Sequence, residues 1–174
     1  MHRLVPRWAD VAPRRGVLAI LVALTAVALT GCSSRKPAPR FSYTLLDGAQ
    51  ASTDTLRGRV VLVNFWATSC ASCVQEMPQI VALHRKFQAR GFETLAVAMS
   101  YDAPASVSHF AQTRQLPFGV VIDNTGAIAR AFPGVRATPT TFVIDRHGAI
   151  ATRIEGEPDF AALHTLVDRL LAET

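Results

Sequence analysis

The stretch that decides the fold is VVLVNFWATSCASCVQEMP, residues 60–78. It lies in a nearly continuous apolar run over 58–67, and such a run is typical of a strand buried on both faces of a parallel sheet. Asn64 is the one polar side chain inside the apolar part of the run. Apolar residues then recur at helical spacing, which predicts a helix over 71–90. Two cysteines stand where this strand gives way to this helix.

The rest of the chain continues the alternation of strand and helix. Strands are expected over 92–100 and 118–123, helices over 104–115 and 125–131, a two-stranded hairpin over 140–156 and a closing amphipathic helix over 159–173. Alternation of this kind predicts the α/β class, with a mostly parallel central sheet and helices on both of its faces. The C-terminal β-hairpin would add antiparallel strands at one edge.

The N-terminus has the pattern of an export signal. Residues 1–15 carry four arginines, and an apolar core of 13 residues follows over 17–29. A spanning helix needs about 20 such residues, although the uncharged flanks leave an uncleaved anchor as an alternative. The sequence LTGC, ending at Cys32, resembles the lipobox of bacterial lipoproteins. We therefore expect a signal peptide over 1–31 and lipidation of Cys32. The protein would then be a lipoprotein of the cell envelope that faces the periplasm.

Composition and charge limit the number of domains and the kinds of partner that the rest of the chain can have. Residues 32–40 are small, polar and proline-containing, as expected of a tether, and 41–174 has the length of one domain. Removing 1–31 takes away four arginines and one aspartate, so 14 basic and 12 acidic side chains remain, a net charge of +2. No basic run interleaves with aromatic residues. We therefore expect no nucleic acid among the partners.

The spacing of Cys70 and Cys73 favours redox chemistry. Residues at i and i+3 share a helix face, so the two sulfur atoms can bond across one turn. Cys70 falls at the start of the helix, where the helix dipole favours a thiolate by about 0.3–1 kcal/mol. The thiolate is the attacking species in thiol–disulfide exchange. In an exported domain, such a pair forms a disulfide readily.

Two other uses of the cysteine pair fit the sequence less well. A structural zinc site needs four ligands, and the chain has no second cysteine pair. His84 is eleven residues beyond Cys73 on the same predicted helix, about 16 Å along its axis. A purely structural disulfide across so short a loop would add little stability. The sequence therefore predicts no metal and no cofactor.

The stretch 60–78, together with RATPTTFVID at 136–145, resembles the TlpA/ResA-like thiol–disulfide oxidoreductases, which have the thioredoxin fold. The resemblance covers about 41–172. It implies that Cys70 is the exposed nucleophile and that Cys73 is the resolving cysteine. It also implies a role for Glu76, whose carboxylate could take the proton of the buried Cys73 thiol. The alternative is an exposed acid whose charge only interacts favourably with the dipole at the helix N-terminus.

The same resemblance implies where a substrate docks. Pro139 matches the family's cis-proline, and Thr138 before it would offer backbone groups to an extended substrate segment. Trp66 is grouped with these two residues as substrate-binding. Ser69 stands where the family often carries a tryptophan, so a flat aromatic lid is missing at that position.

These features predict an exported, membrane-tethered oxidoreductase that reduces the disulfides of partner proteins. The expected partners are disulfide-bearing exported proteins, with apocytochrome c or its maturation factors as candidates, and a membrane electron donor that is itself a thiol protein. Two alternatives share the fold: a peroxiredoxin-type peroxidase and a copper-binding chaperone of the Sco type. The peroxidase motif does not fit around Thr68, and the Sco type spaces its cysteines by three residues rather than two.

Overall fold

The computed structural model describes residues 35–173. The predicted elements from residue 58 onward are confirmed, with bounds that differ by at most three residues. Along the chain, the elements are β1 (Ser42–Thr44), β2 (Gln50–Ser52), the 3-10 turn η2 (Thr53–Leu56), β3 (Val60–Trp66), α2 (Ala71–Phe87), the 3-10 turn η3 (Gln88–Arg90), β4 (Phe92–Ala98), α3 (Pro104–Thr113), β5 (Gly119–Ile122), α4 (Ala127–Ala131), β6 (Thr140–Ile144), β7 (Ile150–Glu155) and α5 (Phe160–Ala172).

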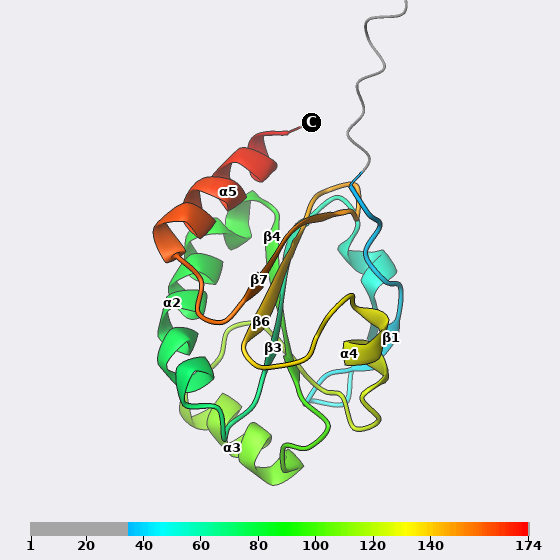
Figure 1. Cartoon of the computed structure of the whole chain (residues 1–174), viewed down its shortest axis with the longest axis vertical. Helices are drawn as coiled ribbons and strands as arrows, with labels where there is room; N and C mark the ends of the chain where they lie inside the picture. The colour runs from blue at the N-terminus through cyan, green and yellow to red at the C-terminus, as the bar shows by residue number, and fades with distance from the viewer. Residues whose placement is uncertain (1–34, 174) are drawn as a thin grey trace, which may run out of the picture. The chain divides into compact units, whose positions relative to one another are not determined.

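The central sheet has five strands in the order β5-β4-β3-β6-β7 (Figure 1). All seven residues of the middle strand β3 are buried, as its unbroken apolar run predicted. Alternate residues of β3 face opposite sides of the sheet. Val60 and Leu62 pack with α2, α3 and α5, whereas Val61 and Val63 pack with α4 and the β1 side. Helices therefore cover both faces, as predicted (Figure 1).

The expectation of a mostly parallel sheet is met in part, and the C-terminal hairpin supplies antiparallel strands at one edge, as predicted. β3 pairs with β4, and β4 with β5, in parallel, but the pairings of β3 with β6 and of β6 with β7 are antiparallel. The connection between β5 and β6 leaves and re-enters the sheet at the same end, so β6 runs antiparallel to β3. The only helix in this connection, α4, has five residues, or about 7.5 Å.

The structured unit begins earlier than predicted. Residues 35–40, assigned to the tether, lie against the β6–β7 turn: Ala38 N donates to Gly148 O at 2.9 Å, and Ile150 N donates to Lys36 O at 2.8 Å. Arg35 Nη1 is 2.8 Å from Asp145 Oδ2. The compact unit therefore starts at Arg35 rather than at residue 41. The short antiparallel pair β1–β2 was also not predicted, because its three-residue strands carry no long apolar pattern.

The predicted signal peptide over 1–31 and the lipidation of Cys32 lie outside the described residues. Across 35–173, no helix is both long enough and apolar enough to span a membrane.

Candidate active site

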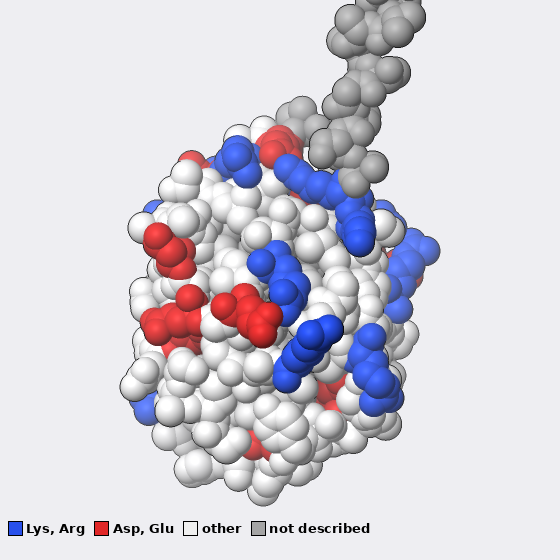
Figure 2. All heavy atoms as spheres, in the orientation of Figure 1, with Lys and Arg blue, Asp and Glu red and all other residues white. Residues whose placement is uncertain are grey.

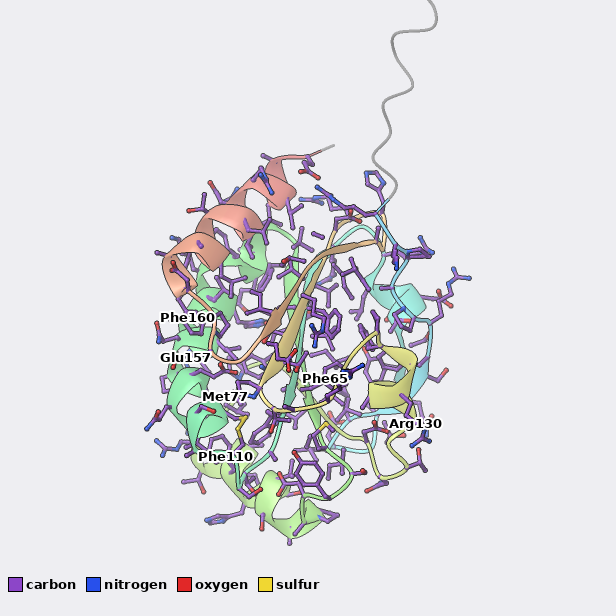
Figure 3. All side chains as sticks on the ribbon, viewed as in Figure 1. Phe65, Met77, Phe110, Arg130, Glu157 and Phe160 are labelled. Atoms are coloured by element: carbon purple, nitrogen blue, oxygen red, sulfur yellow. A yellow bond between two sulfur atoms is a disulfide. The ribbon has the colours of Figure 1, made fainter. Side chains whose placement is uncertain are left out.

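The two cysteines form a disulfide at the start of α2. The structure places Cys70 as the N-cap residue of the helix and Cys73 in its first turn, with their Cα atoms 5.2 Å apart. Figure 3 draws this disulfide as a yellow bond, in the region of the labelled Met77 and Phe110. Cys70 is half-buried, whereas Cys73 is 0% exposed. Only Cys70 is therefore open to attack a partner or to be attacked.

The helix start supplies the environment that a reactive thiolate needs. Cys73 N lies 3.3 Å from the Cys70 sulfur and donates to it, and the Ser72 hydroxyl lies 3.5 Å from the same sulfur. Helix N-terminal N–H groups and the helix dipole both stabilise negative charge. When the disulfide is reduced, these donors favour the thiolate of Cys70. Of the two sulfur-bearing residues, Cys70 is the more exposed.

Glu76 is buried one turn beyond Cys73 and is 0% exposed. Its Oε1 accepts a hydrogen bond of 2.9 Å from Asn64 Nδ2, and its Oε2 has no partner among residues 35–173. Burial raises the pKa of Glu76 from 4.5 to about 7, against the opposing effect of the Asn64 hydrogen bond; nearby Glu157 raises it further. A carboxyl group with such a pKa can accept and return a proton near neutral pH.

Asn64 stands out in the sequence only as a polar residue in a buried strand. The structure gives it a role, because its Nδ2 also donates to Thr141 Oγ1 at 3.0 Å. The amide thus holds the Glu76 carboxyl group against β3 and β6. Asn64 lies on the α2 face of the sheet, since it alternates with Val63 and Phe65 on the opposite face. The signal for this role was its position: a polar side chain inside an otherwise apolar strand needs a buried partner.

The cis-proline loop lies at the same end of the sheet as the cysteines. The peptide bond between Thr138 and Pro139 is cis, as the resemblance implied. Strand β6 starts directly after it, and Thr140 pairs with Phe65 near the end of β3. Pro139 is buried and its carbonyl accepts from Gly156 N at 2.9 Å. Thr138 is half-buried and remains open to a partner.

Trp66 does not occupy the position that was predicted for it. It was grouped with the substrate-binding residues, but it is 0% exposed and packs on Phe110 with ring centroids 5.1 Å apart. The reason is its place as the last residue of β3, which is buried on both faces. Trp66 therefore supports the loop before Cys70 from the core and does not present a surface to a partner.

A carboxylate that the sequence analysis did not single out fixes the loop before Cys70. Asp102 is 7% exposed, and its two oxygens accept from Thr68 N and Thr68 Oγ1, each at 2.6 Å. Thr68 had been considered only for the peroxidase motif. No local sequence signal marks this pair, because its members lie 34 residues apart.

The surface beside the site carries charges of both signs. In Figure 2, acidic side chains gather on the side of α2 and α5, and basic side chains on the side of α4 and β1. The labelled Glu157 and Arg130 mark these two sides in Figure 3. Across residues 35–173, no three His, Cys, Asp or Glu side chains come together as a metal site would require.

Comparison with known proteins gives the chain its family. Residues 35–153 match the AhpC/TSA family. The thiol-disulfide oxidoreductase ResA of Bacillus thuringiensis subsp. konkukian (strain 97-27) is 35% identical over 122 residues, which cover 70% of this chain and 69% of that protein. ResA of Geobacillus thermodenitrificans (strain NG80-2) is 37% identical over 105 residues, 60% of this chain and 59% of that protein.

A solved structure agrees with both the fold and the family. The crystal structure of a thiol:disulfide interchange protein of the thioredoxin family from Chlorobium tepidum TLS superposes with a TM-score of 0.74 at 30% identity. The match covers 80% of this chain and 98% of that chain. The fold is therefore thioredoxin-like, as predicted. The chain belongs to the AhpC/TSA family and, within it, to the group of ResA-type thiol–disulfide oxidoreductases.

Proposed function

We propose that this protein is an exported, membrane-tethered reductase of disulfides in partner proteins. The observation that carries the proposal is the pairing of a half-buried Cys70 at a helix N-cap with a buried Cys73. In this arrangement the Cys70 sulfur bonds to the partner, and the Cys73 sulfur later attacks that bond and releases the partner. The names of the ResA relatives support thiol–disulfide exchange, and the direction toward reduction follows from the same resemblance.

The reaction begins with the reduced protein. The Cys70 thiolate attacks one sulfur of the partner's disulfide, the partner's S–S bond breaks, and the partner's second sulfur leaves as a thiolate. The Cys73 thiol then loses its proton to the Glu76 carboxylate and attacks the Cys70 sulfur. The mixed disulfide breaks, the partner leaves with two thiols, and the protein keeps the Cys70–Cys73 disulfide. Two electrons have moved from the protein to its partner.

Glu76 suits the second step because it is buried on the same helix as Cys73, one turn further on. A carboxyl group with a pKa near 7 is ionised in a large fraction of molecules at neutral pH, yet binds a proton well enough to take it from a thiol. A second thiol protein in the membrane must reduce the disulfide again by the reverse sequence of exchanges. Partners in cytochrome c maturation remain candidates for the disulfide that is reduced.

The proposal includes the lipid anchor at Cys32. The described chain is already fixed to the domain at Arg35, so two residues would separate the lipidated cysteine from the folded unit. A span of two to three residues reaches only about 7–11 Å. The domain would then stay at the membrane surface. Incorporation of a labelled fatty acid into the full chain, and its loss in Cys32→Ser, is the expected result; labelling that persists in Cys32→Ser would contradict the anchor.

Trapping tests the order of attack. In cells, Cys73→Ser should accumulate a mixed disulfide between Cys70 and a partner, visible as a band on non-reducing gels that collapses on reduction. Cys70→Ser is the matched control and should form no such band. A band with Cys70→Ser and none with Cys73→Ser would reverse the assigned roles. Reduction of hydrogen peroxide by the purified chain faster than reduction of a protein disulfide would favour the peroxidase alternative instead.

A further inference from the structure

Tyr101 places an exposed aromatic ring beside the redox site, and the reaction described above does not use it. The residue lies between β4 and α3 and is 64% exposed. Its hydroxyl is 3.3 Å from Oγ1 of Thr138, the residue before the cis-proline. A single exposed aromatic residue is common on protein surfaces and marks no site by itself. Its attachment to the site is what sets this one apart.

The loop that carries Tyr101 is tied to the loop that leads into Cys70. On one side of the ring, Met99 N donates to Trp66 O at 3.0 Å. On the other side, the buried Asp102 carboxylate accepts both hydrogen bonds from Thr68. A further bond of 3.0 Å from Asp102 N to Met99 O closes the turn around Tyr101. These bonds fix the loop that carries the ring without involving its hydroxyl, and the hydroxyl adds a contact with the loop before the cis-proline.

We propose that Tyr101 is a substrate-binding residue that selects partner segments with an apolar or aromatic side chain next to the reacting cysteine. The inference rests on the proposed function and names part of the partner's chemistry. A segment bonded to Cys70 and lying along the cis-proline loop passes the ring, because the Tyr101 hydroxyl already touches Thr138. Of the two residues next to Cys70, Ser69 offers no apolar surface and Ala71 offers only a methyl group.

An aromatic ring is well suited to this task. It has a large apolar face, only two rotatable bonds to fix, and a preference for tilted or offset contacts with other rings. The ring would thus fill the place of the aromatic lid that Ser69 does not provide, from a different loop. A partner with glycine or serine beside its cysteine would leave the ring in water and gain nothing from it.

The test uses the full chain, purified in detergent and reduced beforehand, with two short peptides. Each peptide has one cysteine joined by a disulfide to a small thiol; one has Phe next to the cysteine and the other has Gly. The measured quantity is the ratio of the two second-order rate constants. The wild type should prefer the Phe peptide by about tenfold, which corresponds to about 1.4 kcal/mol. Tyr101→Ala should bring the ratio to within about twofold of one.

Two control variants separate the ring from other effects. Tyr101→Phe keeps the ring and loses only the hydroxyl, so it should keep the preference. Leu46→Ala removes the other large apolar side chain that is exposed within residues 35–173, and it should also keep the preference. A wild-type ratio near one, an unchanged ratio in Tyr101→Ala, or a loss of preference in Tyr101→Phe would each overturn the inference. If the reduced wild type reacts with neither peptide, the proposed function fails as well.

Discussion

Replacing Glu76 by glutamine tests the buried carboxyl group directly, because glutamine keeps the size of the side chain and an oxygen that can accept from Asn64. Burial raises the pKa of Glu76 from 4.5 to about 7 in the folded protein. In the unfolded chain, the pKa returns to its ordinary value. A shift of this size corresponds to about 3 kcal/mol between the two protonation states. The folded protein therefore binds the proton more tightly than the unfolded chain.

The sign of the effect on stability follows from this difference. Wild-type stability from this group is fully present below about pH 4.5 and is lost as pH rises through about 7. The glutamine side chain of the variant does not titrate, so the variant should lack this loss. The free energy of unfolding of Glu76→Gln minus that of the wild type should therefore increase by up to about 3 kcal/mol between pH 4.5 and pH 8. Urea unfolding of the oxidised proteins at several pH values measures it.

The same substitution should slow the release of the partner. A positioned proton acceptor contributes about 10²–10⁴-fold to a proton-transfer step. Stopped-flow measurement should show that Glu76→Gln slows the closing of the Cys70–Cys73 disulfide at least about tenfold more than it slows the attack of Cys70 on the partner. If the difference in unfolding free energy between Glu76→Gln and the wild type does not change with pH, or if both kinetic steps slow equally, Glu76 is only part of the helix packing.

Three further predictions concern other side chains. Asn64→Leu removes the hydrogen bond that lowers the pKa of Glu76, so the pH midpoint of disulfide closing should move above that of the wild type; an unchanged midpoint would separate Asn64 from Glu76. Burial lowers the pKa of His84 below 6.5, so the stability that this group gives the wild type is present above pH 6.5 and is lost as pH falls. His84→Gln should lack that loss when the free energy of unfolding in urea is measured at several pH values. If the free energies of the variant and the wild type fall equally with pH, the assignment is refuted. Arg35→Ala removes a partner of the buried Asp145 carboxylate and should lower the free energy of unfolding by about 1 kcal/mol. Arg40→Ala is the control at a solvated ion pair and should change it by less than about 0.5 kcal/mol. Equal losses in the two variants would count against a stabilising contact at the start of the folded unit.

The sequence was sufficient for the elements from residue 58 onward and for the central motif. The apolar run of β3 and the helical spacing after it depend on local burial patterns, which a sequence displays directly. These two patterns also predicted that the two cysteines lie at the junction of β3 and α2. The share of parallel pairings was less accessible: the edge hairpin was expected to be antiparallel, but the sheet as a whole has two parallel and two antiparallel pairings and is mixed rather than mostly parallel.

The parts of the site that escaped prediction all depend on contacts between distant residues. Asp102 and Thr68 meet although they are 34 residues apart, and Tyr101 reaches Thr138 across 37 residues. Neither pair belongs to a periodic pattern or a short motif. Trp66 shows the opposite error: it was grouped with the substrate-binding residues, but the burial of the strand end places it in the core.

The reduction potential of the Cys70–Cys73 pair tests the central claim, reduction of partner disulfides, most directly. The full chain can be equilibrated in thiol–disulfide buffers and followed by the fluorescence of Trp66, which lies in the core beside the loop before Cys70. Known potentials run from about −270 mV for thioredoxin to about −120 mV for a strong oxidant, and about 30 mV corresponds to 1.4 kcal/mol. A value near the thioredoxin end is predicted. A value near −120 mV would mean that the protein donates disulfides, and the proposed direction of electron flow would be wrong.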